Sequence, residues 1–148
     1  FIKKNCSNKI PKAKKFIDKD NKLLNQLKKN TKNLIELIDN QNLNEFVKTV
    51  VGYSFEANKY FNDSEPWSIK NKDIERMNTI MFVSCEQIKN ISILLNPIIP
   101  NSTNKVLEIM NVKKENRSIS HIDDLNCFDH SKEFKDLKIL FMKIENDN

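Results

Sequence analysis

Apolar side chains recur at helical spacing along three long stretches of this chain. The stretches cover residues 20–38, 43–61 and 73–96. Within each, apolar residues lie three or four positions apart, which places them on one face of an α-helix, while Lys, Asn and Gln occupy the remaining positions. A helix of this kind must pack its apolar face against another element. The pattern therefore predicts an all-α fold in which the first two stretches form a helical hairpin.

The expected inner faces can be read from the same spacing. On the first helix the face is Leu23, Leu27, Leu34 and Ile38 together with Leu24, Thr31 and Ile35. On the second it is Leu43, Phe46, Val47, Val50, Ser54, Ala57 and Phe61. On the third it is Met77, Ile80, Met81, Ser84, Ile88, Ile91, Leu94 and Leu95. We expect Phe16, Phe46, Phe55 and Phe61 to be core or helix-packing residues. Tyr53 and Tyr60 are expected to face away from the apolar stripe.

Polar turns and prolines separate the predicted helices. Asn42 ends a polar turn and is placed to cap the second helix. Residues 62–66 break the pattern, because Pro66 disfavours helical geometry at Glu65. Pro97 and Pro100 end the third helix, and Ser102 is expected to cap a shorter helix that reaches about Met110.

The two ends of the chain carry weaker patterns. Residues 1–5 predict the last turn of a helix that begins upstream, and residues 111–130 are polar and irregular. Leu137, Leu140, Phe141 and Ile144 predict a short final element, helix or strand, that packs back on the body.

Length predicts a single domain over residues 1–148, because a chain of this size can bury a sizeable core. No apolar run approaches the roughly 18 residues that span a bilayer, so no membrane insertion is expected. The chain begins at Phe1 without an initiator Met or a secretory signal, and we interpret it as an N-terminally truncated domain.

No catalytic residue is predicted. The only glycine is Gly52, whereas loops that bind phosphate through their backbone need several glycines. His121 and His130 are the only histidines that could act as general bases near neutral pH. Further potential metal ligands lie near the two histidines: Asp123, Asp124, Cys127 and Asp129. Their irregular spacing is typical of a polar loop, so no metal site is predicted. The three cysteines form no CxxC motif and fit reduced thiols in a cytoplasmic protein.

Basic residues are concentrated at the N-terminal end. Residues 1–32 contain eleven lysines against Asp18 and Asp20, whereas the rest of the chain has 14 basic and 18 acidic residues. The basic end could contact phosphate. Lysine runs are also common on ordinary solvated helix faces, and the two interpretations remain equally open.

Three motifs occur in order between the second and third predicted helices. Phe55-Glu56-Ala57-Asn58-Lys59-Tyr60-Phe61 is followed by Pro66-Trp67-Ser68-Ile69-Lys70, and the third helix ends in Leu95-Asn96-Pro97-Ile98-Ile99-Pro100. This arrangement resembles methionyl-tRNA synthetases, in which an Ala-Asn-x-Tyr helix end leads to a Pro-Trp loop and then to a helix closed by Pro-x-x-Pro. The tail Leu140-Phe141-Met142-Lys143-Ile144 is similar to a family ending, although Met142 stands where a proline is usual.

The resemblance implies an antiparallel helix bundle of the class I aminoacyl-tRNA synthetase anticodon-binding type. It implies that the chain binds methionine-accepting tRNA and needs no cofactor of its own, while a separate catalytic domain in a monomeric, cytoplasmic parent protein uses ATP and methionine. The family's catalytic signatures are absent here, as is an Asn and Arg pair that the family carries on a helix leading into the position of Phe1.

The resemblance also implies that Trp67 contacts RNA. Sequence-specific RNA readers stack splayed bases of single-stranded loops on aromatic side chains, and Pro66 would hold Trp67 ready for that contact. A lone Trp by itself more often closes the end of a bundle. Asn58 is interpreted mainly as a support that bonds the loop backbone, with direct base contact as the alternative.

Three further residues complete the predicted RNA-binding site. Lys59 and Lys70 could neutralise phosphates or be ordinary surface charges, and Tyr60 could line the site. Two other functions remain open on the sequence: a helical adaptor for protein partners, and the anticodon domain of another class I synthetase.

Overall fold

The computed structural model describes residues 1–136, and over these residues the chain is helical without a strand. The α-helices are α1 (Ile2–Asn5), α2 (Asp18–Asp39), α3 (Leu43–Ser64), α4 (Pro66–Ile69), α5 (Ile74–Leu95) and α6 (Pro100–Ile109). Two short 3-10 helices follow, η1 (Lys114–Asn116) and η2 (Ile119–His121). The all-α prediction is confirmed.

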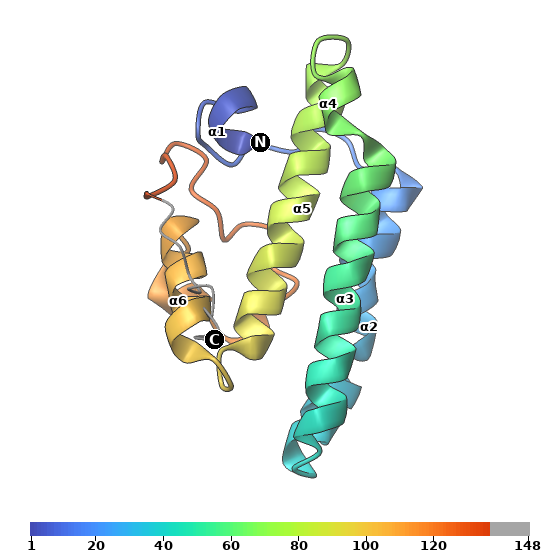
Figure 1. Ribbon diagram of the computed structural model, residues 1–148, viewed down its shortest axis with the longest axis vertical. Coiled ribbons are helices and arrows are strands. Elements are labelled where there is room, and N and C mark those ends of the chain that lie inside the picture. The colour runs from blue at the N-terminus through green and yellow to red at the C-terminus, as the bar shows by residue number, and fades with distance from the viewer. Residues whose placement is uncertain (137–148) are drawn as a thin grey trace, which may run out of the picture.

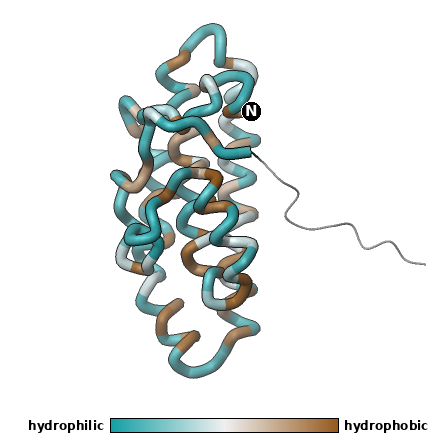
Figure 2. Tube along the Cα trace, turned by 90° about the vertical axis from the view of Figure 1, so that its left-hand side faces the viewer, coloured by the Kyte–Doolittle hydropathy of each residue, from teal (hydrophilic) through white to brown (hydrophobic). Residues whose placement is uncertain are grey.

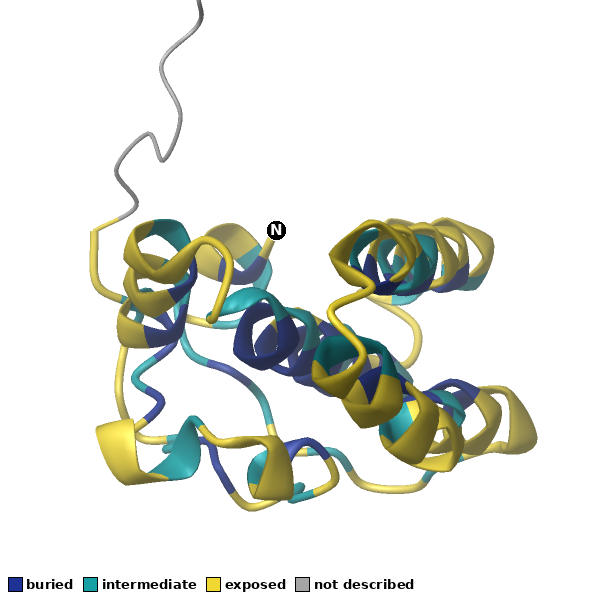
Figure 3. Cartoon of the chain, turned by 90° about the horizontal axis from the view of Figure 1, so that it is seen from below, coloured by how far each residue is buried: buried dark blue, intermediate teal, exposed yellow. Residues whose placement is uncertain are grey.

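The long helices α2, α3 and α5 lie side by side, and α6 packs on α5 away from α3 (Figure 1). Hydrophobic and hydrophilic residues alternate along the trace, as expected for helices that bury one face (Figure 2). Helix α5 is the central element, since fourteen of its 22 residues are buried (Figure 3). It therefore needs apolar residues on more than one face.

The helix boundaries follow the sequence closely. The three long helices were predicted to within three residues at each end, and residues 2–5 form one helical turn. Two predictions need correction. Helix α6 begins at Pro100 with Ile99 in the capping position, so Ser102 lies inside the helix. Asn42 does occupy the N-cap position of α3, but its side chain makes no capping hydrogen bond.

The buried face of α3 differs from the prediction. Tyr53 and Tyr60 are buried, whereas Leu43 is half-exposed and Phe55 is 69% exposed. The reason is that α3 packs between α2 and α5, which buries the side of the helix that carries Phe46, Val50 and both tyrosines. The expectation that Phe55 belongs to the core is wrong.

No helix within residues 1–136 is long and apolar enough to cross a membrane. The predicted final element with Leu137, Leu140, Phe141 and Ile144 lies outside the described residues.

Candidate nucleic-acid interface

The junction between α3 and α4 holds Trp67 in a tight turn. Helix α3 ends at Ser64, and Glu65 adopts a left-handed conformation with φ 43° and ψ 55°. Pro66 is the first residue of α4, where its fixed φ favours the helix and no backbone N–H is needed. The Ser68 backbone N–H and hydroxyl both donate to the Glu65 carbonyl oxygen, at 2.9 and 2.8 Å. Trp67 therefore projects from a closed turn.

The Trp67 ring packs against Phe61 and remains partly exposed. Its centroid lies 5.9 Å from that of Phe61, which in turn lies 6.2 Å from Phe1 in an edge-on contact. Trp67 remains 45% exposed, while Pro66 before it is buried. A half-exposed ring can accept a stacked base, whereas a ring that closes the end of the bundle would be largely covered.

Tyr60 is buried and takes part in a polar cluster with Asp20 and Arg76. Its hydroxyl donates to Asp20 Oδ1 at 2.7 Å, and Arg76 Nη1 and Nη2 donate to Asp20 Oδ2 and Oδ1 at 2.6 and 2.8 Å. The Ile17 N–H donates to Oδ2 at 3.0 Å. Because Tyr60 is only 4% exposed, the prediction that it faces away from the core is wrong, and its ring is not available for stacking.

Electrostatics make this cluster a strong tie between α2, α3 and α5. Burial acts to raise the pKa of Asp20, but the hydrogen bonds from Arg76, Ile17 and Tyr60 and the charge of Arg76 outweigh it, so the pKa is lowered. Burial and the adjacent carboxylate raise the pKa of Tyr60. The cluster is therefore a charged pair with a neutral phenol at neutral pH.

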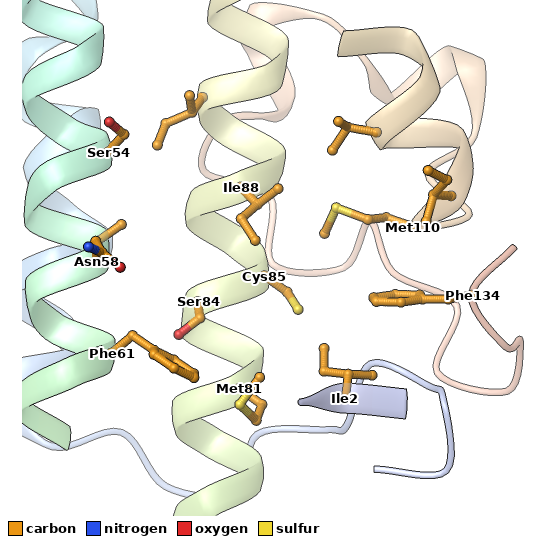
Figure 4. A pocket seen from close by; sticks show the side chains of 14 residues that line it. Ile2, Ser54, Asn58, Phe61, Met81, Ser84, Cys85, Ile88, Met110 and Phe134 are labelled. Carbon is orange, nitrogen blue, oxygen red and sulfur yellow. The ribbon is translucent and has the colours of Figure 1, made fainter. Parts of the chain in front are cut away.

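The remaining predicted residues lie on the surface around the turn. Lys59 forms an ion pair with Asp63 at 3.2 Å, and Lys70 Nζ lies 3.5 Å from Asn5 Oδ1. Asn58 is exposed on α3 one turn before Phe61, facing a groove rather than α4 (Figure 4). Within the described residues, the bonds that close the α3–α4 turn come from Ser68 and not from the Asn58 side chain. The structure thus brings Pro66, Trp67 and Lys70 together and leaves Asn58 apart.

Sequence reasoning missed the aromatic support of Trp67 and the buried cluster that ties the three long helices together. Phe1 and Phe61 support Trp67, yet Phe61 was assigned to packing alone and Phe1 to no role. Arg76 was overlooked although arginine is rare in this lysine-rich chain. That rarity was a usable signal, because arginine can donate two parallel hydrogen bonds to a buried carboxylate and lysine cannot.

A second buried ion pair fixes the loop after α6. Lys89 and Glu86 are fully buried with Nζ and Oε2 2.9 Å apart, and Lys89 donates to the carbonyl oxygens of His121 and Asp124 at 3.0 and 2.8 Å. His130 Nδ1 donates to the Ile10 carbonyl oxygen at 2.9 Å. Residues 1–136 contain no group of His, Cys, Asp and Glu placed to hold a metal ion.

Comparisons with known proteins agree on one family. Residues 10–148 match the family model described as the anticodon binding domain of methionyl tRNA ligase. The chain is 31% identical to the methionine–tRNA ligase of Brucella suis and 33% identical to that of Rickettsia felis, over 82% of this chain and 24% of each relative. A crystal structure of free methionyl-tRNA synthetase from Mycobacterium tuberculosis superposes with a TM-score of 0.88 at 22% identity, over 98% of this chain and 30% of the other.

Proposed function

Because the chain belongs to the family of methionyl-tRNA ligase anticodon-binding domains, we propose that it binds the anticodon loop of a methionine-accepting tRNA. Trp67 stacks on one base of that loop. The half-exposed ring of Trp67, backed by Phe61 and projecting from a closed turn, is the observation that carries the proposal.

Charge around Trp67 supports the same role. Lys70 is exposed three residues after Trp67, within reach of the phosphates that flank a stacked base. Lys59 is exposed as well, but Asp63 already offsets its charge. Asn58 makes at most a secondary contact, since it faces the groove. Tyr60 is buried and bonded to Asp20, so it ties α3 to α2 and makes no contact with RNA.

The chain spans about a quarter of the length of the curated relatives it matches. We propose that residues 1–148 are the anticodon-binding domain of a longer, monomeric and cytoplasmic protein. A separate catalytic domain in that protein would join methionine to tRNA with ATP. One relative of known structure is a methionyl-tRNA synthetase from Mycobacterium tuberculosis bound by methionyl-adenylate. This chain contributes tRNA recognition and no catalytic residue.

The comparisons do not favour the other functions that the sequence left open, a protein adaptor or the anticodon domain of another class I synthetase.

Substitution of Trp67 by Ala tests the proposal. We expect binding to an anticodon stem-loop of methionine tRNA to weaken by about 1 to 3 kcal/mol, or about 5- to 150-fold, because one base–aromatic stack is lost. Fluorescence anisotropy of the labelled stem-loop measures the affinity. Trp67→Phe should retain most of it.

Phe55→Ala is the matched control, because Phe55 is an exposed aromatic residue outside the row of Phe1, Phe61 and Trp67. Circular dichroism checks that each variant is folded. Unchanged affinity of a folded Trp67→Ala variant would contradict the proposed role of Trp67.

A further inference from the structure

A small pocket lies between α2, α5 and the segment that follows η2, on residues that the proposed RNA contact does not use. Its cavity volume is about 200 Å³. Exposed side chains surround its opening, among them Asn25 and Lys28 on α2 and Asp123 after η2. Its lining also includes Glu86 and Asn90 of α5, which are only 0% and 2% exposed. We call this cavity the Glu86 pocket.

The Glu86 pocket contains buried oxygens that lack a hydrogen-bond donor. Within residues 1–136, no group donates a hydrogen bond to Glu86 Oε1, Glu86 Oε2 or Asn90 Oδ1. Lys89 Nζ lies 2.9 Å from Glu86 Oε2, but its hydrogen bonds go to the carbonyl oxygens of His121 and Asp124. Because buried acceptors are normally paired, three orphaned oxygens in one pocket indicate a missing donor.

The charges around the pocket favour a cation. Burial raises the pKa of Glu86 to about 7, and the charges of Asp124 and Asp123 add to that rise while Lys89 opposes it. From the α2 side, Lys28 is the one basic residue that lines the pocket, and it is exposed. A ligand that carries positive charge would therefore offset the repulsion among the three carboxylates.

The shape and chemistry of the lining fit a primary aliphatic amine. An alkylammonium group has three N–H donors and no acceptor, which matches two carboxylate oxygens and one amide oxygen. Leu24, Ile122 and Leu125 form apolar walls that suit a methylene chain. Within residues 1–136 no His, Cys, Asp and Glu side chains are grouped to hold a metal ion, which favours an organic cation.

We propose that the Glu86 pocket binds a primary aliphatic amine, and that a short diamine fits it best. One ammonium group donates to Glu86 and Asn90, the methylene chain lies on Leu24 and Leu125, and the second ammonium group pairs with Asp123 at the opening. The bound amine links α2 to α5 and to the segment after η2.

Calorimetric titration of the chain at pH 8, where Glu86 is ionised, tests the proposal. The probes are 1,4-diaminobutane, n-butylamine and the neutral n-butanol. We expect the diamine to bind more tightly than the monoamine and the alcohol not to bind. Glu86→Gln should weaken binding of the diamine at least about tenfold, because a charge-assisted pair becomes neutral. At pH 6 the natural chain should bind about tenfold more weakly, since Glu86 is then mostly protonated.

Asp123→Asn separates the two ends of the ligand. Asp123 is exposed, so this variant should keep the fold, weaken binding of the diamine and leave that of n-butylamine unchanged. Glu115→Gln is the matched control, because Glu115 is an exposed carboxylate outside the pocket, and it should bind both amines as the natural chain does. Circular dichroism checks that each variant is folded.

Three outcomes would overturn the inference. Absence of binding to the natural chain leaves the pocket to buried water. Equal affinity of the natural chain and a folded Glu86→Gln variant places the amine elsewhere on the surface. Binding that appears only in Lys28→Met assigns the pocket to the side chain of Lys28. No RNA is present, and Trp67→Ala should bind the diamine normally, so the result is independent of the proposed anticodon contact.

Discussion

Buried ionic groups define the molecule at the scale of single residues. Asp20 is fully buried yet satisfied, because Arg76, Tyr60 and the Ile17 N–H all donate to its two oxygens. Glu86 is equally buried, but within residues 1–136 neither of its carboxylate oxygens accepts a hydrogen bond. Lys89 lies close to Glu86, yet the Lys89 ammonium donates its hydrogen bonds to the carbonyl oxygens of His121 and Asp124. The two carboxylates should therefore respond to pH in opposite directions.

Replacing Asp20 by Asn should lower the free energy of unfolding by about 3 to 5 kcal/mol, because Arg76 is left without its carboxylate. The pKa of Asp20 is lowered from 3.8 on folding, so its contribution is present above pH 3.8 and is lost as pH falls through the folded pKa. Urea unfolding between pH 6 and pH 2 measures both effects.

We expect the acid-induced loss of stability to be smaller in Asp20→Asn than in the natural chain. Lys59→Gln, which removes an exposed ion pair, is the control and should change stability by less than about 1 kcal/mol. An Asp20→Asn variant as stable as the natural chain would show that the cluster does not hold the helices together.

Glu86 provides the opposite pH dependence. Burial raises the pKa of Glu86 from 4.5 to about 7, against the lowering effect of Lys89. A raised carboxyl pKa favours the folded state below pH 4.5, and this contribution is lost as pH rises through about 7. Glu86→Gln should abolish that component, which urea unfolding between pH 4.5 and pH 8 can measure. A slope that persists in the variant would assign the pH dependence to other groups.

At the scale of elements, the site depends on how α3 ends. Pro66 makes a helical Glu65 unfavourable, and the left-handed Glu65 stops α3 and turns the chain directly into α4. This conformation places Trp67 against Phe61, one turn back along α3. A residue other than glycine adopts the left-handed conformation at a cost of about 1 to 2 kcal/mol, so the backbone at Glu65 is strained.

Glu65→Gly should therefore stabilise the chain slightly, by about 0.5 kcal/mol, because the relief of strain exceeds the extra chain entropy that glycine loses on folding. Glu65→Val should destabilise it by more than about 1 kcal/mol, since branched side chains fit the left-handed region poorly. Thermal unfolding followed by Trp67 fluorescence compares the three chains. Equal stability of the Val and Gly variants would mean that the turn is not strained.

At the scale of the whole molecule, charge governs the encounter with RNA. The chain has a net charge of +5 and a sequence pI of about 9.0, and eleven of its lysines fall within residues 1–32. Asp20, one of only two acidic residues in that part, is neutralised internally by Arg76. The solvent-facing charge of residues 1–32 is accordingly more positive than the sequence count suggests.

Affinity for the anticodon stem-loop should fall steeply as salt rises, because each phosphate contact releases counterions. Lys70→Gln should reduce the slope of log affinity against log salt by about 0.7, the value for one contact with a single strand. Lys59→Gln should reduce it less, since Asp63 already pairs with Lys59. Titrations at several salt concentrations measure the slopes. A slope near zero for the natural chain would contradict phosphate contact.

The sequence by itself determined the local structure of this protein. Helix spans and the break at Glu65 follow from spacing and from proline, which act over a few residues. The motifs around Asn58 and Pro66 were also enough to indicate the family.

Only the tertiary structure decided which faces are buried and which residues meet. Tyr60 is inside and Phe55 outside because α3 lies between two other helices, and spacing along α3 does not reveal the direction of its neighbours. Phe1 reaches Phe61 across 60 residues to extend the aromatic row that holds Trp67, and Arg76 reaches Asp20 across 56 residues to tie α5 to α2. Such contacts depend on how the helices pack, because a helical period fixes one face relative to its own helix and not to the rest of the molecule.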